Sequence, residues 1–261
     1  MTVTLAGEPI VAFLLASVRI VAWLFVVPPF SSRAVPTMAK VILSLGLAFT
    51  VAPAMAATQI PVGDWELIVT VVTQAFIGLS MGFVTMLLFS AVAAAGSLID
   101  LFGGFSLAQG FDPLGQNMTS VMGKFHSMLA TVLLFATGGH LLVMGGLLRT
   151  FEMLPIGDSP DINGGYDVLT RAFGVFFVTA IQVALPMIAV LFIADLGLAL
   201  MTKVAPQLNA INVMFPVKIG LTLLLVGLSF PVLPQVIDRL VELAMEATAA
   251  IAGSGAAQRS G

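Results

Sequence analysis

The sequence predicts an all-α protein that associates with membranes. Hydrophobic residues make up 59% of the 261 positions and charged residues only 9%, whereas an average soluble domain has about 25% charged residues. So few charges cannot cover a surface that faces water. The apolar residues also form continuous runs of helical length, separated by shorter segments that contain proline, glycine and polar residues. This pattern is typical of membrane helices joined by loops.

The apolar runs define the expected helices, and each run ends where turn-forming residues begin. The run 67–99 has no formal charge. A straight helix of that length would be about 50 Å long, more than the roughly 30 Å of a hydrocarbon core. Gly78, Gly82 and Gly96 are expected bends or sites of close helix contact. The expected apolar helices are 10–30, 41–58, 67–99, 125–148, 172–194 and 219–233, followed by loop-like connections at 149–171 and 195–218, an amphipathic helix at 234–251 and a disordered tail at 253–261.

A glycine-containing apolar loop is expected at 96–120, between two of these runs. Loops of this length are usually functional or disordered, and Phe102, Phe105 and Phe111 argue against disorder because phenylalanine favours burial. Gly104 and Gly110 allow backbone angles that other residues avoid. We therefore expect an ordered loop that other parts of the molecule enclose.

Five ionisable residues in or beside the apolar runs are the candidates for chemistry. Arg19 must face protein or water, since a charge at the centre of a membrane helix costs roughly 2.5–3.5 kcal/mol. We favour a structural contact to a carboxylate or to carbonyl oxygens over a transport pathway. Asp100 and Asp195 lie at the ends of runs, where they would be interfacial or loop-capping groups. His126 and His140 lie about 21 Å apart along one expected helix, too far apart to share a metal ion.

Several function classes are disfavoured by the composition. The sequence has no cysteine, so disulfide and thiolate chemistry is not available. The net charge of -3 argues against nucleic-acid binding. Signatures of serine hydrolases, zinc proteases and P-loop nucleotide sites are absent from the sequence. We therefore expect no catalytic, metal-ligating or cofactor-binding residues, and a protein that is not an enzyme.

Short motifs occur along nearly the whole chain in an order typical of one protein family. They include Gly78-Leu79-Ser80-Met81-Gly82-Phe83, Phe111-Asp112-Pro113 and Ala205-Pro206-Gln207-Leu208-Asn209, together with Arg19, Pro36, Lys40, Asp100, His140 and Lys218. On these residues the chain resembles the FliR family of export-gate proteins, whose relatives in virulence secretion systems form the SctT group. Gln74 and Ser97 depart from the pattern, because many members have glutamate at these two positions.

The resemblance implies a fold, partners and a location. FliR-like proteins resemble a FliP-like helical part followed by a FliQ-like helical hairpin. They assemble with FliP-like and FliQ-like subunits into a helical export-gate complex, with FlhB-like and FlhA-like export proteins as further partners. The implied location is the bacterial inner membrane at the flagellar basal body. Accordingly, we expect a FliP-like part at 1–165 that includes the pore loop 100–120, a FliQ-like hairpin at 166–252, and a disordered tail at 253–261.

The implied function is that of a structural subunit of the gate through which unfolded flagellar proteins cross the inner membrane. Our hypothesis is that the loop helps to close the pore, with phenylalanines as the plug and glycines as hinges. A loop that only packs against neighbouring subunits is the alternative role. The residues assigned to the plug are Phe105, Gly110, Phe111, Asp112, Pro113 and Met118. The alternative function is a multi-spanning small-molecule transporter, whose pathway groups would be Arg19, Asp100, Asp195 and His140.

Overall fold

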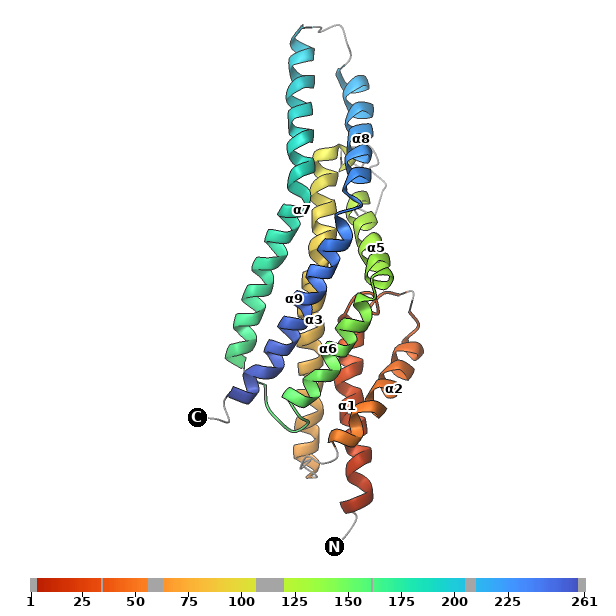
Figure 1. The fold of residues 1–261 in the computed structure, drawn as a ribbon, viewed down its shortest axis with the longest axis vertical. Coiled ribbons are helices and arrows are strands. Elements are labelled where there is room, and N and C mark those ends of the chain that lie inside the picture. The colour runs from red at the N-terminus through yellow and green to blue at the C-terminus, as the bar shows by residue number, and fades with distance from the viewer. Residues whose placement is uncertain are drawn as a thin grey trace. The chain divides into compact units, whose positions relative to one another are not determined.

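The regular secondary structure is α-helical wherever the computed structural model describes the chain, which is over residues 4–33, 35–55, 63–106, 120–160, 162–204 and 210–257. The predicted all-α class is confirmed. Among the described residues, three helices are long and apolar enough to cross a membrane, over Pro9–Val26, Trp65–Gly103 and Asn163–Val204. The helices are α1 (Thr4–Val26), α2 (Thr37–Met55), α3 (Asp64–Gly103), α5 (Val121–Ala136), α6 (Gly139–Met153), α7 (Ile162–Val204), α8 (Ala210–Ser229) and α9 (Leu233–Ala257) (Figure 1).

The chain forms two compact units, and each unit combines separated parts of the sequence. Unit 1 contains Met1–Leu88, Gly138–Phe173 and Arg239–Gly261, and unit 2 contains Phe89–Thr137 and Gly174–Asp238. The chain passes from one unit to the other within α3, α7 and α9. The two units are defined by contacts within the chain, whereas the expected boundary at residue 165 is defined by likeness to FliP-like and FliQ-like proteins. The expected boundary at residue 165 therefore stays a prediction.

Unit 1 is built around α1, whose Ile20 and Trp23 are fully buried. α2 packs against α1, and the N-terminal half of α3 meets α1 at Gly78 and Gly82. A side-chain carbon at Gly82 would lie 3.1 Å from the carbonyl oxygen of Trp23, and one at Gly78 would clash with the carbonyl oxygen of Arg19. The absence of side chains at these two glycines lets the helix backbones approach closely, which is a common device in membrane helices.

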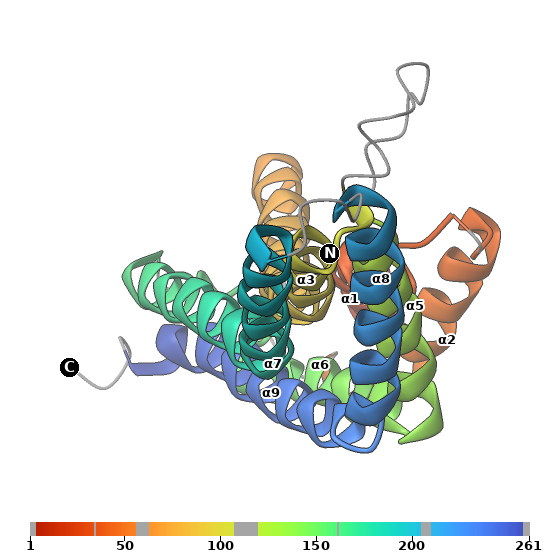
Figure 2. The same cartoon turned by 90° about the horizontal axis from the view of Figure 1, so that it is seen from above.

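Unit 2 has its core where four helix segments meet. The segments belong to α3, α5, α7 and α8, which Figure 2 shows from above. Gly96 of α3 faces α5, where an added side-chain carbon would lie 2.5 Å from the carbonyl oxygen of Met122, so these two helices also pack closely. The buried residues at the centre are Ala95 and Ile99 of α3, Met122 of α5, Ala184 and Met187 of α7, and Val226 of α8.

The expected single helix over 125–148 is wrong, because the chain interrupts it at Thr137 and Gly138. α5 ends at Ala136 and α6 begins at Gly139. Gly138 has a φ of 76°, a left-handed conformation that glycine adopts without the steric cost that other residues incur. His126 and His140 therefore lie on different helices.

The expected loop at 195–218 is wrong over most of its length. α7 continues to Val204 and α8 begins at Ala210, and both helices contain an internal proline, Pro186 and Pro216. A proline removes one backbone hydrogen bond. Next to Pro186, the burial of Ala184 and Met187 in the unit 2 core offsets that loss.

The C-terminal helix agrees with the expected amphipathic pattern and extends beyond its expected end. Leu240 and Ile251 are buried, while Glu242 and Glu246 are exposed. α9 continues to Ala257, into the segment that we expected to be disordered from residue 253. The alanine-rich stretch 247–252 favours this extension, since alanine is the strongest helix former.

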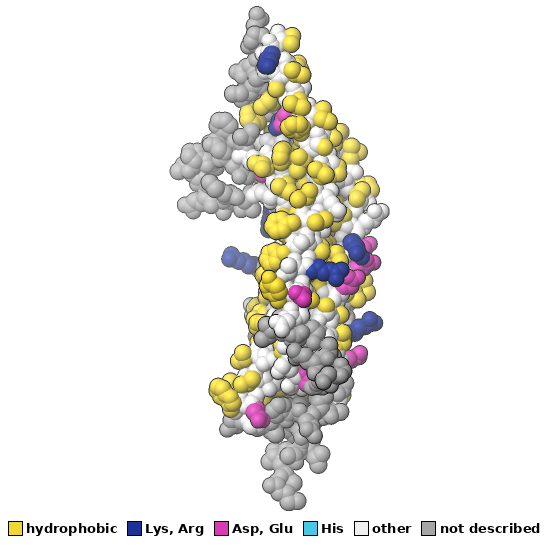
Figure 3. All heavy atoms as spheres, turned by 90° about the vertical axis from the view of Figure 1, so that its left-hand side faces the viewer, with side chains coloured by type: hydrophobic (Ala, Val, Ile, Leu, Met, Phe, Trp, Pro, Cys, Tyr) yellow, Lys and Arg dark blue, Asp and Glu magenta, His cyan; other side chains and the backbone are white. Residues whose placement is uncertain are grey.

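Much of α7 exposes apolar side chains. Only 22% of its span Asn163–Val204 is buried within the chain, compared with 61% of the span in α3. Figure 3 faces this side and shows hydrophobic side chains over much of its upper part. In unit 2 the exposed large residues of α7 include Phe177, Ile181, Leu185, Ile193 and Leu200. A straight 43-residue helix is about 65 Å long and a hydrocarbon core about 30 Å thick, so lipid alone cannot cover this face.

Candidate functional site

Arg19 on α1 is fully buried in unit 1, and groups from two other segments surround its guanidinium. Nε donates a hydrogen bond to Oε1 of Gln74 on α3 at 2.7 Å, and Nη2 donates to the carbonyl oxygen of Leu154 at 2.9 Å. Cζ lies 4.2 Å from the ring centroid of Phe151 on α6, within the range of a cation–π interaction. Arg19 therefore connects α1 to α3 and to the end of α6.

The contacts of Arg19 help to choose between the two roles considered for it, a structural contact and a transport pathway. The side chain is 0% exposed, and a buried charge is tolerated only where polar partners replace its hydration. The carbonyl oxygen of Leu154 is one of the partner types expected, while the amide of Gln74 takes the place of a carboxylate. Asp158 acts on the guanidinium electrostatically. The arrangement is that of a structural contact, and this role stays our interpretation.

Two polar contacts hold the base of the central loop in unit 2. Asp100, near the end of α3, accepts a hydrogen bond through Oδ1 from the backbone N–H of Met122 at 3.1 Å. Ser120 is the N-cap of α5, and its Oγ accepts from the backbone N–H of Gly123 at 2.8 Å. Both oxygens satisfy N–H groups that the first turn of a helix leaves free. We expected Asp100 to be an interfacial or loop-capping group, which implies exposure, but it is only 3% exposed.

The chain enters the loop later than expected, because α3 continues to Gly103. A side-chain carbon at Gly103 would lie 2.7 Å from Oγ1 of Thr222, so close packing on α8 supports the longer helix. Gly104 has a φ of 86° and redirects the chain. Phe105 is then half-buried against the unit 2 core. The other residues assigned to the plug lie outside the described residues: Gly110, Phe111, Asp112, Pro113 and Met118.

Lys218 and Asp195 form an ion pair between α8 and α7. The ammonium nitrogen Nζ lies 2.8 Å from Oδ1 of Asp195 and 2.9 Å from Oδ2. The lysine side chain is 9% exposed and the aspartate side chain 35%. A nearly buried ammonium group requires such a partner. Asp195 therefore links two helices, and it lies within α7 and not at the loop boundary that we expected.

Three of the remaining motif residues lie near the starts of helices. Pro36 directly precedes α2, and its carbonyl oxygen accepts from the backbone N–H of Ala39 at 3.0 Å. Lys40 in the first turn of α2 is 6% exposed, with Nζ 5.2 Å from the ring centroid of Phe25. His140 is half-buried in the first turn of α6. Pro206, Gln207 and Asn209 lie outside the described residues.

His126 has a structural position that the sequence did not reveal. The side chain is 0% exposed, and Nδ1 lies 2.8 Å from the carbonyl oxygen of Met122. It is accommodated because Gly96 on α3 has no side chain, which would otherwise approach Nδ1 to 2.9 Å. No pattern in the sequence pairs His126 with Gly96. Among the described residues, no group of three or more histidine, cysteine, aspartate or glutamate side chains could hold a metal ion.

Comparisons with known proteins agree with one another. Residues 10–244 match the model of the family described as bacterial export proteins, family 1. The chain belongs to this family. It is 32% identical over 222 residues to the flagellar biosynthetic protein FliR of Escherichia coli (strain K12), and 34% identical over 227 residues to that of Pectobacterium carotovorum subsp. carotovorum. Each alignment covers 85% of both chains. A Bacillus subtilis (strain 168) protein of the same name is 28% identical over 243 residues, covering 90% of this chain and 92% of its own.

Membership of this export family confirms the resemblance to FliR that the motifs indicated. The structure also places the two residues that depart from the expected FliR pattern. Gln74 supplies a neutral acceptor to Arg19. Ser97 is exposed and donates to the carbonyl oxygen of Ala93 in its own helix at 3.1 Å. Arg19 therefore has a hydrogen-bond acceptor at position 74 although the residue there carries no charge.

Proposed function

We propose that the chain is a structural subunit of the flagellar type III protein export gate in the bacterial inner membrane. The observation that carries the proposal is the family match over residues 10–244, joined by relatives that are flagellar biosynthetic proteins by name. The long apolar helices support a membrane location. Arg19, Asp100 and Asp195 each make contacts between helices, which supports a structural role over a catalytic or transport role.

Partner subunits would cover the apolar face of α7. Since lipid reaches only about half of the length of this helix, the remaining apolar surface needs protein neighbours. FliP-like and FliQ-like subunits would supply them, and FlhB-like and FlhA-like proteins would complete the apparatus. In this proposal residues 1–165 are the FliP-like part and residues 166–252 the FliQ-like hairpin. The ion pair between Lys218 and Asp195 would hold the two arms of that hairpin together.

The central loop would help to close the channel until unfolded export substrates arrive. Contacts on both sides of the loop hold its ends in place. Asp100 and Ser120 bind the first turn of α5, and Gly103 packs on α8. Phe105 contacts the unit 2 core, so we assign it to the base of the loop. The closing role then falls on Phe111, with Gly110, Asp112, Pro113 and Met118 around it.

The function is tested by export from cells that lack the chain. Deletion of its gene should abolish secretion of flagellar filament protein into the medium and abolish motility. A plasmid copy should restore both. Normal secretion in the deletion strain would contradict the proposal.

The closing role of the loop is tested by replacing residues 107–119 with a Gly/Ser sequence of the same length. Phe105 is kept, because its loss would disturb the unit 2 core. We expect increased leakage of ions or small solutes through the assembled complex. The matched control replaces residues 56–62, between α2 and α3, and should not leak. Unchanged leakage in a normally assembled 107–119 variant would favour a loop that only packs against its neighbours.

A further inference from the structure

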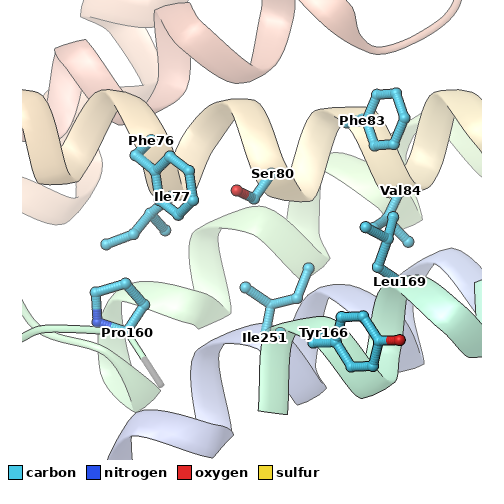
Figure 4. Close-up of a pocket in the computed structure, with 10 residues that line it drawn as sticks. Phe76, Ile77, Ser80, Phe83, Val84, Pro160, Tyr166, Leu169 and Ile251 are labelled. Atoms are coloured by element: carbon cyan, nitrogen blue, oxygen red, sulfur yellow. The ribbon is translucent and has the colours of Figure 1, made fainter. Parts of the chain in front are cut away.

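Unit 1 contains an apolar cavity that lies apart from the contacts described so far. Phe76 and Phe83 of α3 form one wall, and Pro160, Tyr166 and Ile251 form the opposite wall (Figure 4). The cavity volume is about 290 Å³. A cavity of roughly 150 Å³ holds one benzene molecule, so this one has room for about a dozen carbon atoms.

The lining favours an uncharged and apolar occupant. None of the described lining residues carries a charge. The polar side-chain groups among them are the hydroxyl groups of Ser80 and Tyr166. Apolar cavities bind hydrocarbons in preference to water. An ion would lose its hydration there without gaining partners.

The position of the cavity along α3 indicates where such an occupant comes from. Trp65 begins the span of α3 and is 73% exposed, and exposed tryptophans of this kind anchor helices at the membrane interface. Phe76 is eleven residues further along, about 16 Å on the helix axis. One leaflet of the hydrocarbon core is about 15 Å thick. Ile68, Val72 and Phe76 are exposed at four-residue spacing, so an apolar stripe connects the expected interface to the cavity.

We propose that this cavity binds the terminal part of one phospholipid acyl chain whose headgroup lies at the level of Trp65. The proposal requires the N-terminal half of α3 to lie in the membrane, but it does not depend on the channel or on the closing loop. Gly165 forms part of the wall, and a side-chain carbon there would meet no atom within 4 Å. A larger side chain can therefore be placed at this position of the lining without meeting a neighbouring atom at its first carbon.

Quenching of tryptophan fluorescence by brominated lipid tests the proposal in the full chain, reconstituted in phosphatidylcholine nanodiscs. Trp65→Phe combined with Phe76→Trp places a reporter in the cavity wall, while the second native tryptophan, Trp23, is fully buried. The acyl chains are brominated either near their ends or near the headgroup. Gly165→Leu adds a large apolar side chain to the lining of the cavity. The matched control is Gly174→Leu, the same change on the same helix at another glycine with no atom within 4 Å of the added carbon.

We expect bromine near the chain end to quench the reporter more strongly than bromine near the headgroup. Gly165→Leu should reduce the chain-end quenching about twofold, because a filled cavity excludes the lipid chain, and Gly174→Leu should leave it unchanged. Equal quenching with and without Gly165→Leu would overturn the proposal. So would stronger quenching from the headgroup position, a comparison that needs no cavity variant and holds even if Gly165→Leu does not fold.

A protein side chain is the competing occupant of the cavity. The same measurement on the chain co-expressed with FliP-like and FliQ-like subunits distinguishes it from lipid. Chain-end quenching that persists in the complex supports the acyl chain. Quenching that disappears when the partners bind would overturn the proposal and assign the cavity to a neighbouring subunit.

Discussion

Removal of the Gln74 amide should destabilise the protein through Arg19. Gln74→Leu deletes the acceptor that lies 2.7 Å from Nε of Arg19, at a site where both side chains are 0% exposed. Hydrogen bonds to charged groups contribute about 1.5–3 kcal/mol. Interhelical hydrogen bonds measured in a membrane protein average about 0.6 kcal/mol and reach about 1.7 kcal/mol. The two ranges meet at about 1.5 kcal/mol, so we expect roughly a tenfold decrease in the folding equilibrium constant.

A double-mutant cycle measures this interaction. Unfolding in detergent of the parent protein, Gln74→Leu, Arg19→Leu and the double variant is followed by the fluorescence of Trp23, which is buried one helical turn from Arg19. A Trp65→Phe background removes the other tryptophan. Each single substitution leaves a buried polar group without its partner. The double variant should therefore be less destabilised than the sum of the single variants, by about 1.5 kcal/mol.

Gln74→Glu is the matched control for size and for the acceptor. At neutral pH it should be no less stable than the parent protein, because its carboxylate would form a charge-assisted hydrogen bond with the guanidinium. A coupling energy near zero between positions 19 and 74 would refute the reasoning. A Gln74→Glu variant as unstable as Gln74→Leu would refute it as well.

Three contacts in unit 2 give further predictions, each measured by thermal unfolding of the purified protein. Gly96→Ala should lower stability by about 1–3 kcal/mol, because overpacking follows when the added carbon meets the Met122 carbonyl oxygen at 2.5 Å; Gly145→Ala, where nothing lies within 4 Å, should be neutral or stabilising. Asp195→Asn should cost about 1 kcal/mol, a value reduced by the partial exposure of the pair, since it leaves the ammonium group of Lys218 without a carboxylate. Asp100→Ala should cost about 1 kcal/mol by removing a cap of α5, and Asp100→Asn, which keeps an acceptor, should cost less. Equal stability of Gly96→Ala and Gly145→Ala would contradict the close packing at Gly96. Asp195→Asn as stable as the parent protein would contradict the contribution of the ion pair. Equal stability of Asp100→Ala and Asp100→Asn would contradict the capping role of Asp100.

The all-α class was predictable because apolar runs of helical length have few alternatives in a protein with so little charge. The helix ends were harder to predict. Pro216 and its neighbours suggested a loop by local rules, yet the chain is helical from Ala210 to Ser229. Gly138 resembles many other glycines of the sequence, and its left-handed conformation is what separates α5 from α6. Local residue preferences are weak compared with the packing of neighbouring helices.

In the candidate site, too, features that depend on local sequence were predictable and features that depend on distant contacts were not. The need of Arg19 for polar partners follows from its position in an apolar run. Its partners Gln74 and Leu154 are 55 and 135 residues away in the sequence, and no local pattern identifies them. The capping role of Asp100 follows from its place at the end of a run, whereas its burial depends on α5, which begins beyond the loop. Sequence patterns therefore indicate that a charge needs a partner, and the fold determines which partner it has.

The central claim is that this chain is one subunit of a larger export gate. Native mass analysis of the tagged, detergent-purified protein tests it most directly, with the FliP-like and FliQ-like proteins either co-expressed or left out. The account predicts a single large complex that contains one copy of this chain and several copies of each partner. A well-behaved monomer or homodimer that ignores both partners would contradict it and would favour the small-molecule transporter.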